Sequence, residues 1–282
     1  MAERKLFICD YEDTYHLRPG HPEESEVNAV RRFRRDGNLF GIVFETNTFL
    51  AMANMGEYED EYDFIIGSTG AGGIAMLPLD GDRRAHTRIF TDTVNQYYAC
   101  ELYDLFVSVG ASVVSVDVLG FAGGHSVGDM LRSQYDPAKG QGCYVQYWAG
   151  GGKYVVCLTN RDGLLLTTPF TQFNGTFKNH ITAEGLAAEV NRRYHGKLRA
   201  YAAGNDVNVV SVATSKAEAV RRCAEYAGIS AENVWTFGNG TEDACMLREF
   251  NGIAKSDGHS AVLAATQRQA KTVEEAIDII CG

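Results

Sequence analysis

Two carboxylates lie two residues apart near the start of the chain. Asp10 and Glu12 belong to the run Cys9 to Tyr15, which directly follows the apolar residues Leu6-Phe7-Ile8 and so comes at the end of a predicted buried strand. Open parallel α/β sheets place their functional side chains at such strand ends. Paired carboxylates there can supply a nucleophile, an acid and metal ligands, the groups needed for phosphoryl transfer through a carboxylate intermediate. The alternative is an ordinary turn or helix cap, because acidic residues are common in both.

The composition is that of an acidic globular protein. The chain has 282 residues, of which 45% are hydrophobic, so we expect a packed core. The formal net charge of -10 disfavours binding to nucleic acid or to an anionic membrane through a general electrostatic field. No apolar stretch approaches the roughly 20 residues of a membrane span, and no signal peptide is recognisable, so we expect a cytoplasmic protein. The seven cysteines never form C-x-x-C, which argues against a zinc or dithiol site.

The first part of the chain alternates between strand and helix patterns. A helical pattern from Glu23 to Arg35 lies between the apolar runs at residues 6–8 and 39–44. A further helix is expected from Phe49 to Met55, before the apolar run at residues 64–66. A strand-helix-strand series of this kind predicts a parallel sheet covered by helices.

The middle of the chain has a different character. Helical patterns at residues 92–107 and 183–193 are mixed there with β-rich runs and glycine-rich turns, which indicates a separate α+β unit. The strand-helix alternation returns with a strong helical pattern from Lys216 to Ala227. The predicted domains are an α/β core of residues 1–83 and 212–282 and an inserted α+β unit of residues 84–211.

Further polar groups fall at strand ends or helix starts of the predicted core sheet. They are Thr46 with Asn47, then Lys216, and then Asn239 with Glu242 and Asp243. Each group has an ordinary structural alternative. Thr46 could cap the helix that follows it, and Asp243 could be a favourable carboxylate at a helix N-terminus. Lys216 could be an exposed lysine, although a lysine near a helix N-terminus is unfavourable unless an anion compensates it.

Four segments carry these residues in a fixed order. They are Asp10-Tyr11-Glu12-Asp13-Thr14, Thr46-Asn47-Thr48, Ser215-Lys216 and Gly238-Asn239-Gly240-Thr241-Glu242-Asp243, with Thr69-Gly70-Ala71 after the third strand. Their order and spacing resemble the D-x-D-G-T, T-G-R, serine-lysine and G-D-x-x-N-D motifs of the haloacid dehalogenase-like (HAD) superfamily. Within it, the chain looks like the Cof-type, sugar-phosphatase-like branch. The resemblance implies a Rossmann-like parallel-sheet core with an inserted α+β cap domain.

The resemblance also implies a function and a set of site residues. The function would be hydrolysis of a small phosphorylated metabolite, such as a sugar phosphate, by a Mg²⁺-dependent phosphatase. Asp10 would attack phosphorus to form an aspartyl-phosphate, and Glu12 would act as the acid and base. Thr46, Asn47 and Lys216 would bind the phosphate. The Mg²⁺ ligands would come from Asp10, Glu12 through its main-chain carbonyl, Asn239 and Asp243.

Several motif positions differ from the family pattern. Glu12 stands where the family has an aspartate, and Asn239 replaces a metal-ligating aspartate. The other replacements are Asp13 for glycine, Asn47 and Thr48 for glycine and arginine, and Glu242 for asparagine. These replacements support a second hypothesis, a catalytically impaired HAD-fold protein that binds a phosphorylated ligand or a partner without turnover.

Overall fold

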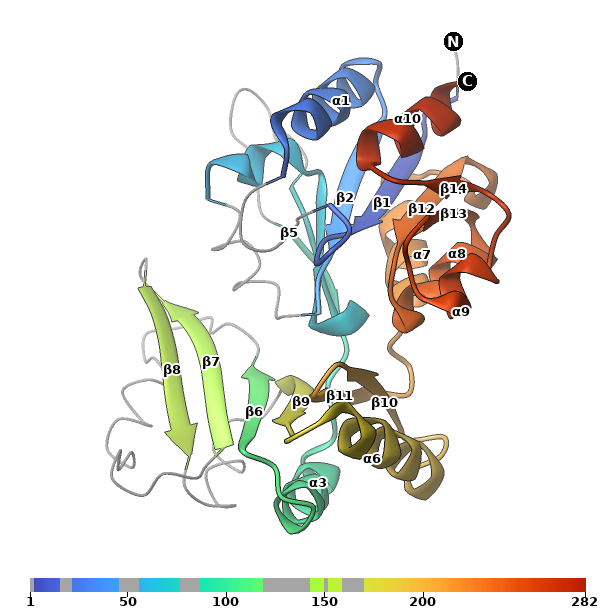
Figure 1. The fold of residues 1–282 in the computed structure, drawn as a ribbon. Helices are drawn as coiled ribbons and strands as arrows, with labels where there is room; N and C mark the ends of the chain where they lie inside the picture. The colour runs from blue at the N-terminus through green and yellow to red at the C-terminus, as the bar shows by residue number, and fades with distance from the viewer. Residues whose placement is uncertain are drawn as a thin grey trace. The chain divides into compact units, whose positions relative to one another are not determined.

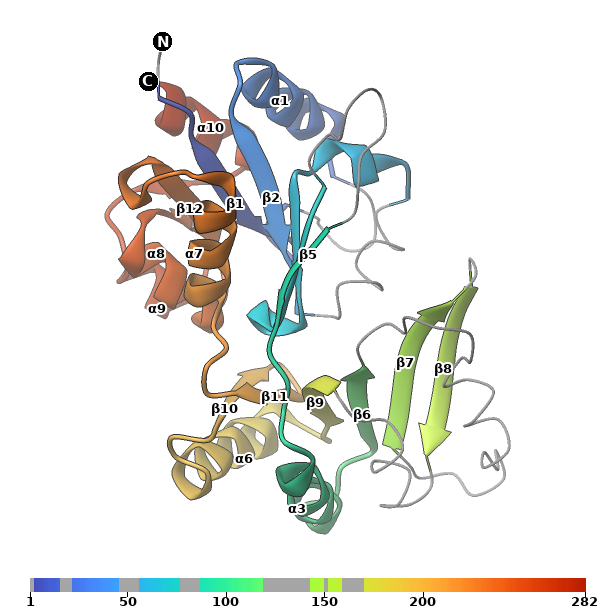
Figure 2. The ribbon, with the colours of Figure 1, turned by 180° about the vertical axis from the view of Figure 1, so that it is seen from behind.

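A computed structural model describes residues 3–15, 22–45, 56–76, 87–118, 143–149, 152–158 and 170–282 (Figure 1, and seen from behind in Figure 2). The chain forms two compact units, one of residues Met1–Thr91 with Ser215–Gly282 and one of residues Asp92–Thr214. None of the helices in the described ranges is both long and apolar enough to span a membrane.

An eight-stranded sheet forms the centre of the first unit. Its strand order is β14-β13-β12-β1-β2-β3-β4-β5. The strands are β1 (Leu6–Asp10), β2 (Leu39–Val43), β3 (Phe64–Gly67), β4 (Gly72–Ala75), β5 (Thr87–Thr91), β12 (Val234–Gly238), β13 (Asn251–Lys255) and β14 (Gln269–Ala270). Neighbouring strands from β14 to β3 are parallel, and β4 and β5 extend the edge in antiparallel orientation. The predicted α/β class with a Rossmann-like parallel core is therefore confirmed.

Helices cover both faces of this sheet (Figures 1 and 2). One face carries α1 (Glu24–Arg35) and α10 (Val273–Cys281), and the other carries α7 (Lys216–Ala227), α8 (Ala244–Glu249) and α9 (Ser260–Leu263). The 3-10 helices of this unit are η1 (Gly56–Glu61), η2 (Ser68–Gly70), η4 (Ala231–Asn233) and η5 (Thr241–Asp243). In β1, Phe7 packs on the α1 side, whereas Leu6 and Ile8 pack on the α7 side. Because both faces are covered, β1 is apolar until its last residue, Asp10.

The second unit has its own sheet and core. The strand order is β10-β11-β9-β6-β7-β8, and only the pair β6 and β7 is parallel. The elements are α3 (Gln96–Ser108), β6 (Val113–Val118), β7 (Cys143–Ala149), β8 (Gly152–Leu158), β9 (Phe170–Thr176), α6 (His180–Arg193), β10 (Leu198–Ala203) and β11 (Asp206–Ser211). Phe106 of α3, Val190 of α6 and Phe173 of β9 share one buried cluster. This is the predicted α+β unit.

The boundaries between the two units differ from those expected. Residues 87–91, which the sequence placed in the inserted unit, form β5 and pair with β4 in the first sheet. Conversely, residues 212–214 belong to the second unit. The strand was missed because β5 is an edge strand with no fully buried side chain, and so it lacks the apolar signal of a core strand. The expected helix from Phe49 to Met55 lies outside the described residues, and the role of the second unit as a cap stays a prediction.

Candidate active site

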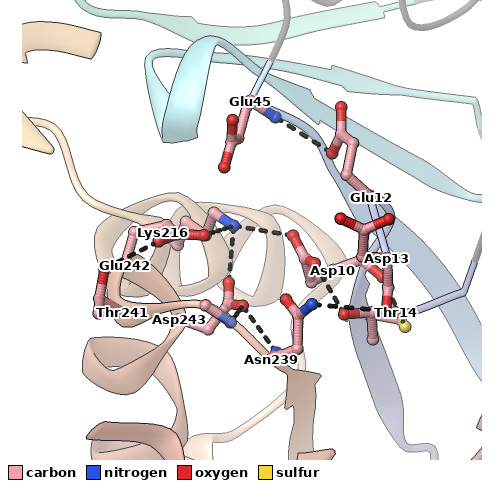
Figure 3. A network of polar contacts seen from close by, with 12 residues as sticks. Asp10, Glu12, Asp13, Thr14, Glu45, Lys216, Asn239, Thr241, Glu242 and Asp243 are labelled. Carbon is pink, nitrogen blue, oxygen red and sulfur yellow. Dashed lines mark hydrogen bonds and ion pairs between the residues drawn. The ribbon is translucent and has the colours of Figure 1, made fainter. Parts of the chain in front are cut away.

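The fold brings the predicted residues of three motifs to one edge of the first sheet. β1 and β12 are parallel neighbours, so their ends place Asp10 and Asn239 side by side. α7 begins at Lys216, and η5 ends at Asp243. Figure 3 shows that the side chains of Asp10, Lys216 and Asp243 point toward one another. Asp10 and Lys216 meet although they are 206 residues apart in sequence.

Lys216 is the centre of this cluster. Its side chain is 0% exposed, and its Nζ donates hydrogen bonds to Oδ1 of Asp10 at 2.8 Å and to Oδ1 of Asp243 at 2.6 Å. A third, longer contact of 3.4 Å reaches Oε1 of Glu242. An ammonium group has three N–H donors, so all three have an acceptor here. A buried lysine is tolerated only when it is paired in this way.

The backbone around α7 fixes the position of Lys216. The side chain of Ser215 caps the helix by accepting a hydrogen bond from the main-chain N–H of Glu218 at 3.1 Å. Gly70, in the turn after β3, has φ +101, and a Cβ added there would lie 2.7 Å from the carbonyl oxygen of Ser215. Ser68 and Thr69 in the same turn also have positive φ values, 51 and 53. A strained turn with a glycine at its point of contact therefore packs directly against the start of α7.

Asp243 connects Lys216 to the loop that follows β12. Its Oδ2 accepts hydrogen bonds from the main-chain N–H groups of Asn239 at 2.9 Å and Gly240 at 2.8 Å. A Cβ at Gly238 would lie 2.5 Å from Cγ of Asp243, so the glycine leaves room for this carboxylate. Asp243 thus shapes the loop and holds the lysine at the same time.

Asp10 is held on both carboxylate oxygens. Oδ1 accepts from Lys216, and Oδ2 accepts from the hydroxyl of Thr14 at 2.9 Å. Burial raises the pKa of Asp10 to about 7, against the opposing effect of Lys216 and with a further contribution from the charge of Glu12. Burial, followed by the charge of Asp10, raises the pKa of Asp243 to about 8. Three carboxyl groups thus surround one lysine, and burial disfavours the ionised forms of Asp10 and Asp243.

Glu12 extends away from Asp10 toward the end of β2 (Figure 3). Its Oε2 accepts a hydrogen bond from the main-chain N–H of Glu45 at 3.3 Å. Burial, and then the charge of Glu45, raises the pKa of Glu12 to about 7. A carboxyl group with such a pKa is available in both protonation states near neutral pH, which suits general acid and base chemistry.

Asn239, in the loop after β12, lies next to Asp13, in the turn after β1. The side-chain Nδ2 of Asn239 lies 3.4 Å from the main-chain carbonyl oxygen of Asp13. Asp13 has φ 56, so it occupies the left-handed region at the position where the resembled family has glycine. Asp13 therefore keeps the left-handed backbone conformation that glycine favours, although it is not a glycine.

This conformation predicts a stability difference between two variants. Asp13→Gly and Asp13→Ala remove the same carboxylate, but only alanine keeps a Cβ at φ 56. We expect Asp13→Gly to be more stable than Asp13→Ala by about 1 kcal/mol, because a left-handed alanine is sterically strained. Urea unfolding of both variants would measure the difference. An alanine variant as stable as the glycine variant would contradict the strain.

Two predicted phosphate-binding residues and the predicted metal ligands complete the site expected from the sequence. Thr46 and Asn47 lie outside the described residues, so their predicted contacts with phosphate stay predictions. Within the described ranges, no group of three or more His, Cys, Asp or Glu side chains is arranged to hold a metal ion. The donor types nevertheless suit Mg²⁺, which prefers oxygen ligands, because Asp10 and Asn239 carry side-chain oxygens at the neighbouring ends of β1 and β12.

Two contacts of the site were not foreseen from the sequence. The hydroxyl of Thr14 holds Asp10, and the carboxylate of Glu242 reaches Lys216. Thr14 belongs to the same motif as Asp10, and this proximity in sequence was the one sign that its hydroxyl could contact Asp10. Glu242 carried a signal only as a replacement, since the resembled family has an asparagine there.

The chain matches one family profile in sequence and several solved structures in fold. Residues 153–277 match the sequence profile of the haloacid dehalogenase-like hydrolases. No curated protein matches the chain significantly in sequence. In structure, the chain is similar to BT1666 from Bacteroides thetaiotaomicron, a phosphatase of the HAD enzyme superfamily, with TM-score 0.72, 15% identity, and coverage of 99% of this chain and 95% of that one.

Two further structures are similar over almost their whole length. The HAD subclass IIB sugar phosphatase BT4131 has TM-score 0.67 and 17% identity, with 96% of this chain and 95% of that chain covered. SMU.1108c from Streptococcus mutans UA159 has TM-score 0.70 and 14% identity, with 99% and 98% covered. The profile match over residues 153–277 and the shared fold confirm the predicted resemblance to the haloacid dehalogenase-like hydrolases.

Proposed function

We propose that the chain is a Mg²⁺-dependent phosphoric monoester hydrolase that acts on a small phosphorylated metabolite, such as a sugar phosphate, through an aspartyl-phosphate intermediate. The observation that carries the proposal is the buried ammonium of Lys216, held 2.8 Å from Asp10 at the end of β1. A carboxylate fixed beside a cation is suited to attack phosphorus while the cation offsets phosphate charge. The shared fold of the sugar phosphatase BT4131 supports the substrate class.

The chemical steps can be assigned to residues of this chain. A carboxylate oxygen of Asp10 attacks phosphorus, and the bond from phosphorus to the leaving oxygen breaks. Protonated Glu12 gives its proton to that oxygen. Ionised Glu12 then takes a proton from a water molecule, whose oxygen attacks phosphorus and releases phosphate from Asp10. The pKa of Glu12, which burial raises to about 7, supports both roles near neutral pH.

Neighbouring residues would bind the phosphate and the metal. Thr46 and Asn47, which follow β2, would donate to phosphate oxygens together with Lys216. Asp10 and Asn239 would hold Mg²⁺ with the main-chain carbonyl of Glu12. The bound ion would screen the phosphate from the surrounding carboxylates.

For Asp243 we propose a positioning role in place of direct metal binding. Its two oxygens accept from Lys216 and from the main-chain N–H groups of Asn239 and Gly240. A carboxylate with that many donors is already well satisfied, and it orients the loop that carries Asn239.

A second candidate function is binding of a phosphorylated ligand without turnover. The observation that favours it is the neutral amide of Asn239 at the position of a metal-ligating carboxylate, since hard divalent ions prefer carboxylates. A phosphatase screen over a metabolite panel, with Mg²⁺ and with EDTA, separates the two. Activity that EDTA removes supports the hydrolase, and silence across the panel together with phosphate binding supports the second candidate.

Restoring the carboxylate at position 239 is expected to tighten Mg²⁺ binding by at least about tenfold. A unit charge at about 4 Å from a cation contributes roughly 4 kcal/mol at an effective dielectric of about 20, before desolvation is subtracted. Calorimetric titration of Asn239→Asp with Mg²⁺ would measure the change. Asn28→Asp, which adds the same charge on α1, is the matched control and should leave the affinity unchanged. Equal affinities in Asn239→Asp and the wild type would argue against Asn239 as a ligand.

A substitution of Glu12, the proposed acid and base, can be measured together with Asn239→Asp. Glu12→Asp shortens the side chain to the length that the resembled family uses, so turnover in Asn239→Asp/Glu12→Asp should equal or exceed that of the wild type. Turnover that appears only in this double variant would establish binding without catalysis as the function of the natural chain.

A further inference from the structure

The carboxylate of Glu242 is held in a fixed position beside Lys216. Its Oε1 lies 3.4 Å from Nζ of Lys216, and its Oε2 accepts a hydrogen bond from the hydroxyl of Thr241 at 3.2 Å. Glu242 as a whole is only 8% exposed. Both oxygens therefore have a partner, and the side chain is ordered against the site by contacts at its charged end.

Gly240 provides the space for this conformation. A Cβ added at Gly240 would overlap the carboxylate of Glu242, and no other group lies as close to that position. The backbone of Gly240 has φ -90 and ψ 167, which is extended backbone that any residue can adopt. Glycine is thus needed here for the side chain of Glu242 and not for the backbone, because Glu242 folds back over it.

Two of the three N–H donors of Lys216 are bound by Asp10 and Asp243, and Glu242 binds the third. Asp10 and Asp243 hold two N–H groups at 2.8 and 2.6 Å, whereas Glu242 holds the third at 3.4 Å. A phosphate that binds to Lys216 displaces this third and weakest contact most easily, because the contacts with Asp10 and Asp243 are shorter and Asp243 is fully buried.

We propose that Glu242 is an internal anion that competes with phosphate for Lys216 and thereby lowers the affinity of the site for inorganic phosphate. The inference rests on the proposed function, in which Lys216 binds a phosphate oxygen. A phosphate dianion must displace the carboxylate of Glu242 from Lys216 and then lie near its negative charge, as well as near those of Asp10 and Glu12. Weak retention of inorganic phosphate makes release of the product easier and leaves substrate affinity to contacts with the rest of the metabolite.

Two variants of different chemistry test this competition. Glu242→Gln removes the charge but keeps the shape of the side chain. Gly240→Ala keeps the charge but forces the carboxylate of Glu242 away from its present position, at a residue whose backbone accepts alanine. Glu232→Gln, an exposed acid in η4, is the control for the change in net charge. Calorimetric titration with inorganic phosphate would be made on the full chain, in Mg²⁺ and in EDTA.

We expect Glu242→Gln and Gly240→Ala to bind inorganic phosphate about tenfold more tightly than the wild type, and Glu232→Gln to bind as the wild type does. If either site variant fails to fold, the other decides the question. Site variants that bind inorganic phosphate as weakly as the wild type, or more weakly, would overturn the inference and leave the proposed function intact. If phosphate affinity falls only in the presence of Mg²⁺, Glu242 binds the metal and does not compete with phosphate, which also overturns the inference. No phosphate binding in the wild type or in any variant would overturn the proposed function together with the inference.

Discussion

Replacing Asp10 with asparagine is expected to lower phosphate release by at least about a thousandfold. The amide cannot form the acyl-phosphate, so the first covalent step is lost, whereas the remaining site keeps its binding contacts. Asparagine has nearly the same shape: its Oδ1 can still accept from Lys216, and its Nδ2 can donate to the hydroxyl of Thr14, the two groups that hold the oxygens of Asp10 at 2.8 and 2.9 Å. The measurement is kcat/KM on a phosphoester that the wild type hydrolyses, with urea unfolding to verify the fold.

The neighbouring acid provides a matched control for this substitution. Asp13→Asn makes the same change from carboxylate to amide three residues further along, and asparagine tolerates the φ of 56 found there. We expect kcat/KM to change by less than about tenfold in this control. Turnover in Asp10→Asn that matches the wild type would refute the aspartyl-phosphate mechanism, because that mechanism requires the carboxylate of Asp10 as its nucleophile.

The core fold was predictable because its strands are buried on both faces. β1 and β2 are entirely buried and read as short apolar runs, and the helix pattern after β1 matches α1 closely. The polar residues that end β1 and β12 then had to meet, since parallel neighbours present their carboxyl ends at the same edge. The sequence thus predicts that Asp10, Asn239 and Lys216 lie in one region of the core.

Other features depend on packing that sequence patterns do not carry. β5 is an edge strand with exposed or half-buried side chains, so its residues show no core pattern, and the sequence predicts the end of the core domain before them. Glu12 is longer than the aspartate of the resembled family, but its direction toward Glu45 follows from a main-chain N–H at the end of β2. The position of Glu242 depends on the absence of a Cβ at Gly240, a contact between side chain and backbone that only the folded loop creates.

Replacing Lys216 with methionine is expected to lower the free energy of unfolding by about 3–5 kcal/mol near pH 8. Methionine keeps much of the length and the apolar contacts of lysine but leaves the buried carboxylates without their cation. The carboxylates concerned accept from Lys216 at 2.6, 2.8 and 3.4 Å, in Asp243, Asp10 and Glu242 respectively. Removing one partner of a buried ion pair is costly because the charge left behind remains desolvated.

The loss of unfolding free energy in Lys216→Met should depend on pH, in a direction set by the pKa values of Asp10 and Asp243. Burial raises the pKa of Asp10 to about 7 and that of Asp243 to about 8, above their values in the unfolded chain. A group with a raised folded pKa contributes stability that is complete below its unfolded pKa and is lost as pH rises through its folded pKa. Since Lys216 opposes these shifts, the variant should lose more stability than the wild type between about pH 5 and about pH 8.

Urea unfolding in EDTA at both pH values would measure this difference. We expect a deficit in Lys216→Met of less than about 1.5 kcal/mol near pH 5, where Asp10 and Asp243 are mostly protonated, and the full deficit near pH 8. Lys255→Met is the matched control, because the only ion pair of Lys255 in the described part of the chain is with Asp257, whose side chain is 73% exposed. Although Lys255 itself is largely buried, its carboxylate partner lies in water, where solvent screens the pair and leaves no desolvated charge behind, so the deficit in Lys255→Met should be smaller and nearly independent of pH. A deficit in Lys216→Met that is equal at both pH values would show that the lysine stabilises the fold by packing, and the charge compensation inferred for Asp10 and Asp243 would then be wrong.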